Sequence, residues 1–220
     1  MHGQMGKVIA PAKRSYRSDL RASQADATRR AVIDAAARVC RAGGWPTATI
    51  ASIAKEAGVS KETIYATFGS KVALIGEMVM ANVAEHVPGQ HFLEQERPRA
   101  IAAESDPVRQ IELWADYLTD IMKRVAPLMT VVRTGSEVEP EMNKLYRAIQ
   151  QRRHDDLGIV AASIVRHAQL RHGLTVADVT DILWQNQSPE MFTLLTEISG
   201  YSSKRFARWL ADTLKVLLLR

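Results

Sequence analysis

Several features that would point to other classes of protein are scarce or missing in this sequence of 220 residues. It has one cysteine, Cys40, so no disulfide can form within the chain, as is typical of proteins in a reducing compartment. No apolar run approaches the roughly 20 residues that span a membrane. The N-terminus lacks the apolar stretch of about 7 to 15 residues found in a signal peptide. We therefore expect a soluble, cytoplasmic protein.

Signatures of catalysis, metal binding and cofactor binding are also lacking. There is no Walker loop and no GxGxxG, and the segment 69–71 (GSK) has no glycine loop before it. His167 and His172 are five residues apart and would point to different sides of a helix. The carboxylates of the segment 137–141 (EVEPE) suit the start of a helix better than a metal ion, and Cys40 lies in an apolar helical pattern. We expect no enzyme, metal site or cofactor.

The positive charge of the chain is concentrated near its N-terminus. The formal net charge is +5, and the first 71 residues carry 12 Lys and Arg against 5 Asp and Glu. The remaining residues carry 17 against 19. This asymmetry indicates that the N-terminal third meets a polyanion, either nucleic acid or an anionic membrane.

Apolar residues recur at helical spacing, and no convincing strand pattern occurs, so the predicted fold class is all-α. The glycines at 43–44, 58 and 69 divide the N-terminal part into helices over 24–42, 50–57, 61–68 and 71–86. Further helices are predicted over 107–125, 139–171 and 175–186, with a last helix capped at Ser202 or Ser203. Pro127 and Gly135 are expected to bracket a short apolar piece, and Pro189 to begin a fresh helical turn.

Three regions follow from this pattern. Residues 1–23 are expected to form a basic, mostly disordered arm, and residues 24–71 a small helical unit. Residues 72–220 are expected to form a larger helical domain, connected through the helix that starts near 71. Prolines at 88, 98 and 107 predict a linker within the last region.

The short helices 50–57 and 61–68 have the layout of a helix-turn-helix. Ala54 is small where the two helices must cross, and Gly58 falls where the turn needs a positive φ. A small apolar core is supplied by Ile53, Ala57, Val59 and Ile64. These requirements are independent of one another, so a sequence that meets all of them favours a helix-turn-helix.

The second helix of such a motif lies in the major groove of DNA, with its N-terminal residues near base edges. Lys61 can donate to guanine, and Thr63 can hydrogen-bond or touch a thymine methyl. Tyr65, Thr67 and Lys71 are suited to phosphates. Glu62, in the same first turn, either favours the helix dipole or accepts a hydrogen bond from cytosine.

The stretch TIASIAKEAGVSKETIYATFGSKVALI (49–75) resembles the DNA-binding domain of the TetR family of bacterial transcription regulators. Arg30, the 32–33 and 35–36 pairs and Val39 fit the helix that precedes it, and the resemblance covers roughly residues 26–75. The C-terminal stretch LWQNQSPEMFTLLTEISGYSSKRFARWLADTL is similar, more loosely, to the last two helices of family members.

The resemblance implies a homodimer on a palindromic operator of double-stranded DNA, with a small-molecule effector bound in the C-terminal domain. It assigns DNA contacts to the helix-turn-helix residues Thr49, Ser60, Lys61, Glu62, Thr63, Tyr65, Thr67 and Lys71. One position departs from the family pattern, because Ala51 stands where many members have an arginine. We hypothesise that Arg14 and Arg17 compensate by entering a neighbouring minor groove.

Two further sets of residues belong to the C-terminal region. The dimer interface is expected to form from apolar residues of the last two helices. In the alternative interpretation these residues pack on their own chain. They are Met191, Phe192, Leu195, Phe206, Trp209, Leu210 and Leu214. Candidate effector-site residues, for which core packing is the alternative, are Trp114, Tyr117, Met122, Met129 and Arg133.

The sequence therefore favours a DNA-binding transcriptional regulator, a repressor released from its operator by a small molecule. Two alternatives remain at this stage. One is a helical small-molecule-binding protein or enzyme without a DNA role. The other is a membrane-surface protein that uses the basic arm.

Overall fold

The computed structural model describes residues 13–84 and 91–220, with side chains from residue 22 onward. The described residues form helices and contain no strand, which confirms the all-α prediction; one isolated bridge joins Leu170 to Leu219. The α-helices are α1 (Lys13–Thr47), α2 (Ile50–Ala57), α3 (Lys61–Phe68), α4 (Lys71–Val83), α5 (Glu96–Ala102), α6 (Pro107–Val138), α7 (Pro140–Val165), α8 (Val176–Asn186), α9 (Pro189–Thr193) and α10 (Ser203–Leu218). Short turns of other helical type are η1 (Phe92–Glu94) and η2 (Leu194–Ile198).

In this part of the chain no single helix is long and apolar enough to cross a membrane. Only α3 and α4 pass such a test together, by length and composition, and they are bent by 71° at the break between them.

The helix-turn-helix has the predicted boundaries because each end carries its own stop signal. Thr49 caps α2 and shares a capping box with Ser52, and Ser60 caps α3 by accepting a hydrogen bond from the Thr63 amide. Gly58 ends α2 with φ 68°, a left-handed conformation that glycine adopts without strain. Ile53 and Ile64 are fully buried between the helices.

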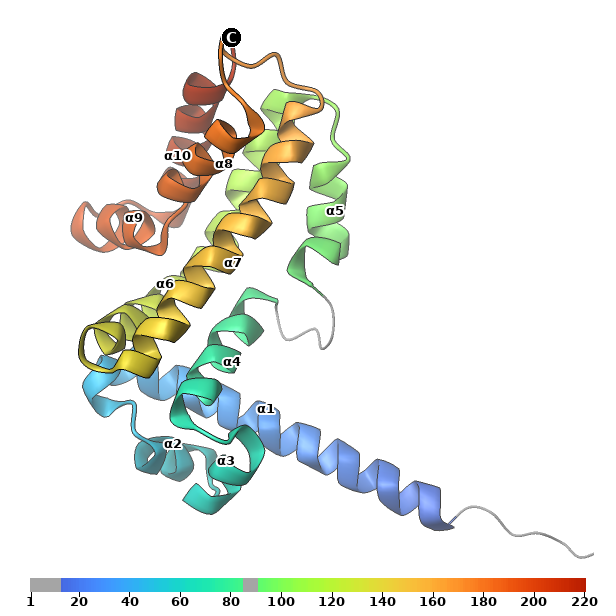
Figure 1. Ribbon diagram of the computed structural model, residues 1–220, viewed down its shortest axis with the longest axis vertical. Helices are drawn as coiled ribbons and strands as arrows, with labels where there is room; N and C mark the ends of the chain where they lie inside the picture. The colour runs from blue at the N-terminus through green and yellow to red at the C-terminus, as the bar shows by residue number, and fades with distance from the viewer. Residues whose placement is uncertain (1–12, 85–90) are drawn as a thin grey trace, which may run out of the picture.

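The structure corrects the expected basic arm. Residues 1–12 lie outside the described residues, but α1 begins at Lys13, so residues 13–23 are helical. The sequence has neither glycine nor proline between Lys13 and the glycine at 43, and nothing else there stops a helix. Figure 1 shows the first half of α1 projecting past the other helices of the N-terminal domain.

Three expectations about the C-terminal region are also wrong. The predicted linker contains η1 and α5, and Pro98 is buried in the first turn of α5, where a helix needs no amide donor. Helix α6 runs unbroken through Pro127 and Gly135, because the residues between them are packed on neighbouring helices. Helix α7 ends at Val165, and the chain after it pairs with the C-terminus, where the Arg171 amide donates to the Leu218 carbonyl over 2.9 Å.

Helix α6 is the centre of the molecule. It contacts α1, α4, α5, α7, α9 and α10, and runs beside α7 along the length of the C-terminal region (Figure 1). Helix α4 packs on α1 and α3 at one side and on α6 and α7 at the other, with Leu74, Ile75 and Met78 fully buried. One helix therefore belongs to both parts of the chain.

A close approach between Trp45 and α6 fixes the joint. A Cβ placed on Gly135 would lie 3.0 Å from three atoms of the Trp45 ring. Lys71 also lies over the Trp45 ring, with its Nζ 3.5 Å from the ring centroid. Gly135 is thus a contact residue rather than a helix breaker.

We expect Gly135→Ala to destabilise the protein relative to Gly158→Ala. Both glycines are helical, but a Cβ on Gly158 meets only the Thr180 hydroxyl oxygen at 3.9 Å. Gly158→Ala should raise the free energy of unfolding by about 0.5–1 kcal/mol through helix propensity. The free energy of unfolding of Gly135→Ala should be about 1–3 kcal/mol lower than that of Gly158→Ala, because the added methyl group overpacks against Trp45. Equal gains in urea denaturation would contradict the close contact.

Candidate functional site

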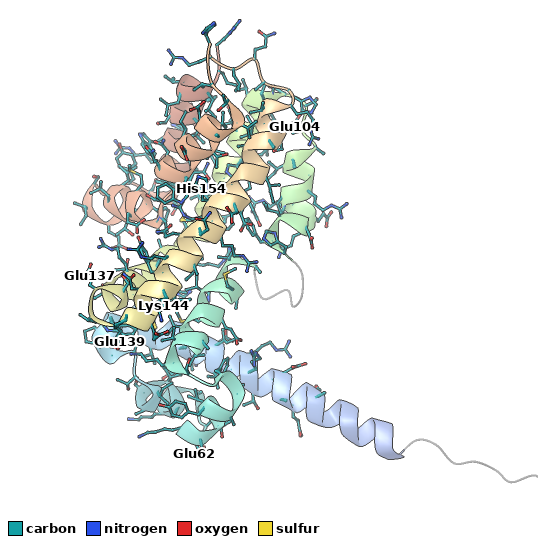
Figure 2. The ribbon with its side chains drawn as sticks, viewed as in Figure 1. Glu62, Glu104, Glu137, Glu139, Lys144 and His154 are labelled. Carbon is teal, nitrogen blue, oxygen red and sulfur yellow. The ribbon has the colours of Figure 1, made fainter. Side chains whose placement is uncertain are left out.

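The outer face of α3 presents polar side chains at the surface of the helix-turn-helix. Lys61 and Glu62 are exposed in its first turn, and Tyr65 is 52% exposed one turn later. Figure 2 shows Glu62 at the tip of the domain, pointing away from the body of the protein. Thr49, also exposed, lies at the start of α2. These side chains are accessible to an external partner.

The remaining polar residues of α3 are partly engaged within the helix. The Ser60 and Thr63 hydroxyls lie 3.1 Å apart, and the Thr67 hydroxyl donates to the Thr63 carbonyl over 2.7 Å. Thr63 and Thr67 are half-buried. Their hydroxyl oxygens keep acceptor capacity, whereas the Thr67 proton is already used.

Glu62 is held locally. Hydrogen bonds from its own backbone amide and from the Ser60 hydroxyl lower the pKa of its carboxyl. A carboxylate in this position also interacts favourably with the N-terminus of α3. Of the two roles that the sequence left open, these contacts favour the helix-terminus role.

Arg29 on α1 supports α3 and has no obvious signal in the sequence. Its guanidinium donates to the Thr67 carbonyl over 3.1 Å, pairs with Glu77 of α4 at 2.5 Å and lies 4.8 Å from the centroid of the Phe68 ring. One side chain therefore ties the end of α3 to both neighbouring helices. Its role is to position the exposed face.

Lys71 does not lie on the exposed outer face of α3 with Lys61, and the basic arm is a separate segment. Lys71 covers the Trp45 ring and its Nζ lies 3.8 Å from a Glu139 carboxylate oxygen, so it belongs to the joint between the two parts of the chain. Figure 2 places Glu139 at the turn that joins α6 to α7. Arg14 and Arg17 fall in the first turns of α1, and their side chains lie outside the described part of the structure.

A second candidate site is a cavity enclosed mainly by α4, α6 and α7. It encloses about 710 Å³ free of protein atoms, a volume that includes its open mouth. Three of the five predicted effector residues line it, namely Trp114, Met122 and Met129. Tyr117 is buried but does not line the cavity, and Arg133 is exposed beside a different hollow under α9.

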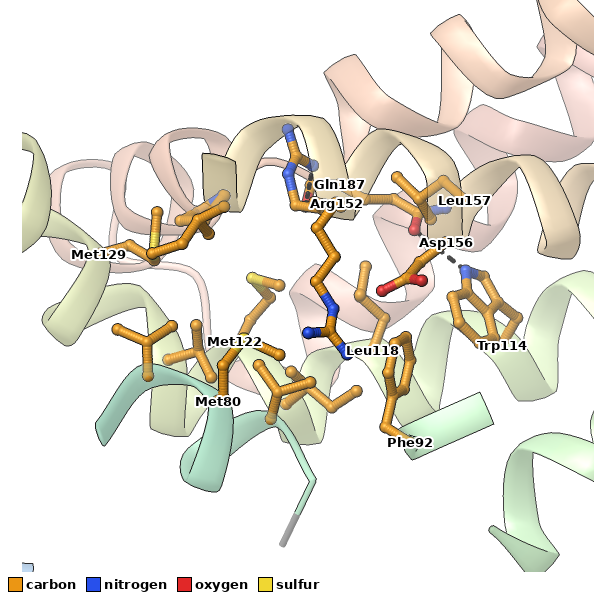
Figure 3. A pocket seen from close by; sticks show the side chains of 17 residues that line it. Met80, Phe92, Trp114, Leu118, Met122, Met129, Arg152, Asp156, Leu157 and Gln187 are labelled. Atoms are coloured by element: carbon orange, nitrogen blue, oxygen red, sulfur yellow. Dashed lines mark hydrogen bonds between the residues drawn. The ribbon is translucent and has the colours of Figure 1, made fainter. Parts of the chain in front are cut away.

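The cavity is apolar except at one end. Figure 3 shows Met129 at the opposite end from Trp114, and the Arg152 side chain reaching across the middle. The Trp114 indole donates to the Gln187 side-chain oxygen over 3.0 Å, while the Gln187 amide nitrogen has no hydrogen-bond partner among the described residues. Gln187 is 1% exposed. Sequence reasoning missed Gln187 because a glutamine after a helix carries no local signal of a cavity.

Ionisable groups frame the same end. Asp156 lines the cavity and lies 3.0 Å from His91 Nε2. Burial raises the pKa of the Asp156 carboxyl, and the charges of His91 and Arg152 oppose that change. Burial lowers the pKa of Arg153 to about 10, which leaves it charged at neutral pH while it donates to the Trp184 carbonyl.

The predicted dimer residues divide into two groups. Phe192, Phe206, Leu210 and Leu214 are buried in their own chain, so the alternative of internal packing applies to them and they cannot present side chains to a partner. Met191, Leu195 and Trp209 are half-buried. The exposed apolar side chains nearby are Leu194 and Ile198, which the sequence did not single out.

No group of three or more potential metal ligands comes together among the described residues. Burial raises the pKa of the Cys40 thiol to about 11, so it is protonated at neutral pH and packs as a core residue.

Comparison with known proteins agrees with this geometry. Residues 32–78 match the family model of the bacterial regulatory proteins of the tetR family. A search of curated proteins found no match. Among solved structures, FadR of Bacillus subtilis in complex with stearoyl-CoA has a TM-score of 0.66 at 17% identity, covering 84% of this chain and 96% of that one.

Two other solved structures are similar over most of their length. A candidate transcriptional regulator from Saccharomonospora viridis in complex with choline gives a TM-score of 0.64 at 18% identity, covering 89% of this chain and 99% of that one. A TetR-family regulator from Agrobacterium tumefaciens gives 0.61 at 16% identity, covering 88% and 99%.

The described residues form an all-α protein in two parts, an N-terminal unit with an exposed helix-turn-helix and a larger helical region. Residues 32–78 match the TetR family model in sequence, and the chain as a whole is similar in fold to solved TetR-family regulators.

We expect Lys71→Met to lower stability and Lys61→Met to leave it unchanged. Both lysines are the first residue of a helix, but only Lys71 lies on an aromatic ring. Loss of that contact should cost about 0.5–2 kcal/mol in the free energy of unfolding. Chemical denaturation of both variants measures the difference. The same midpoint for both would show that the joint does not depend on Lys71.

Proposed function

We propose that this protein is a repressor whose release from DNA is controlled by a small molecule bound in the α4–α6–α7 cavity. The observation that carries the proposal is the position of α4. Its N-terminus follows the recognition helix directly, and Val79, Met80 and Val83 near its other end line the cavity. A molecule in the cavity therefore contacts the helix that supports the DNA-binding face.

The DNA-binding domain in this proposal comprises residues 24–71, and the effector-binding and dimerisation domain residues 72–220. Helix α3 enters the major groove, with Lys61 and Thr63 at base edges. Tyr65, Thr67 and the Thr49 and Ser60 caps contact phosphates, and the excess of positive charge in the first 71 residues adds a salt-dependent attraction. Lys71 contributes through the joint, and Glu62 through the terminus of α3.

Effector control requires the small molecule to bind one conformation more tightly than the other. The cavity has room for a ligand, and two proteins of the same fold were solved with choline and with stearoyl-CoA. Occupation of the cavity would displace α4 and with it the spacing of two recognition helices. The alternative of a helical small-molecule-binding protein without a DNA role predicts the same ligand binding but no operator.

A homodimer supplies the second recognition helix. Its surface includes the half-buried Met191, Leu195 and Trp209 together with the exposed Leu194 and Ile198 of the same region. Two such faces packed about a two-fold axis would match a palindromic operator.

Operator binding should depend on Lys61 and Tyr65. With an operator selected from random DNA, mobility shift at two salt concentrations should show a steep fall in affinity with salt. Lys61→Ala should weaken binding by about 10- to 100-fold, and Tyr65→Phe should weaken it less. Lys144→Ala removes the same charge from an exposed site on α7 and serves as the control. The proposal is wrong if the three variants bind alike.

The dimer should depend on Ile198. This side chain is 76% exposed next to the half-buried apolar residues, whereas Ile159 is 61% exposed on α7. Light scattering should give a dimer for wild type and for Ile159→Glu, and a monomer at low micromolar concentration for Ile198→Glu. A monomeric wild type would exclude the symmetric arrangement.

A further inference from the structure

We infer that the cavity binds an apolar monocarboxylate, with Gln187 as the hydrogen-bond donor to its head group and Arg152 as the cation beside it. This inference rests on the proposed function, because it names the class of effector for the same cavity. It is carried by an unpartnered buried amide, by the arrangement of charges around it and by the shape of the space.

The orientation of the Gln187 amide follows from its neighbour. The Trp114 indole nitrogen can only donate, so the atom facing it at 3.0 Å must be the amide oxygen. The amide NH₂ is then the group left over, and it has no partner among the described residues although Gln187 is 1% exposed. A buried donor without a partner is costly, and a ligand that brings an acceptor relieves that cost.

Gln110 shows how the amide nitrogen of a buried glutamine is used within the fold. That nitrogen donates both to the Ile101 carbonyl and to the Ser163 hydroxyl, at 3.1 and 3.2 Å, whereas the Gln110 side-chain oxygen has no partner among the described residues. Gln110 does not line the cavity. The contrast points to an external acceptor for Gln187.

The charges around the cavity favour an anion over a cation. The Arg152 side chain reaches across the middle of the cavity (Figure 3), and the half-buried Arg153 also lines it. Asp156, the one carboxylate among the described residues that line the cavity, already has His91 at 3.0 Å as its partner. A carboxylate can accept from the Gln187 amide and lie beside Arg152.

The rest of the space suits a short apolar body. Between the polar end and Met129 the walls are aliphatic and aromatic. The aliphatic chain of hexanoate or octanoate can lie against these walls.

The test is calorimetric titration of the full-length protein with sodium octanoate, 1-octanol and octylammonium chloride. Octanoate should bind about tenfold more tightly than octanol, and octylammonium more weakly than either, because the three differ only in the head group. Octylammonium binding as tightly as octanoate would overturn the inference, as would no binding of any of them.

Variants separate the two head-group contacts. Gln187→Leu should weaken octanoate binding about tenfold, whereas Gln110→Leu should leave it unchanged. Gln187→Glu keeps an acceptor for Trp114 and should weaken octanoate but not octanol. Arg152→Gln should bring octanoate down to the affinity of octanol, and Arg147→Gln, which removes a charge of α7 outside the cavity, should not. Unchanged octanoate affinity in Gln187→Leu and Gln187→Glu would overturn the role of Gln187.

Mobility shift on the same preparations distinguishes this inference from the proposed function. Operator binding without any octanoate binding overturns the effector class and leaves the DNA role standing. Octanoate binding with the expected variant pattern but without operator binding supports the site and contradicts the regulator.

Discussion

Asn82 holds together the three helices on which the rest of the structure depends. It is 6% exposed near the end of α4, where its side-chain nitrogen donates to the Met78 carbonyl and its side-chain oxygen accepts from Arg41 of α1 over 2.7 Å. Its own carbonyl accepts from Arg124 of α6 over 3.1 Å. A buried polar network of this kind is stable only when its members are satisfied together. These hydrogen bonds therefore specify the relative positions of α1, α4 and α6, in addition to the apolar packing between the helices.

Helix α4, which is fixed in this way, also forms a wall of the cavity. The cavity and the outer face of α3 therefore both depend on the position of α4. The N-terminal end of α4 is tied to the helix-turn-helix through Ser70 at its cap, and Lys71 in its first turn lies on Trp45. Packed interiors do not deform continuously, because each arrangement of side chains excludes intermediate ones. A ligand that enlarges the space beside Met80 would therefore favour a second arrangement of the whole helix rather than a local adjustment.

The sequence predicted the helix-turn-helix well and α6 poorly, because the signals that can be recognised in a sequence act on residues close by along the chain. Thr49, Gly58 and Ser60 act on their immediate neighbours, so their effect can be seen without the fold. Pro127 and Gly135 carry equally strong local signals, but the packing of α6 overrides the first and the Trp45 ring explains the second. The periodicity of α10 identified apolar residues correctly without telling whether their own chain or a partner covers them.

The cavity illustrates the same limit more sharply, because its polar end is assembled from helices far apart in sequence. Trp114 was a candidate from its residue type alone. Gln187 becomes a candidate only because the fold brings it to the Trp114 indole, 73 positions away in the sequence, which fixes the orientation of its amide. Because that bond fixes the amide, its donor is already oriented before any ligand arrives, and little side-chain freedom is lost on binding. A molecule held there reaches from the end of α8 toward α4. In the proposed mechanism, the free energy gained at the fixed donor favours the position of α4 that accommodates the ligand.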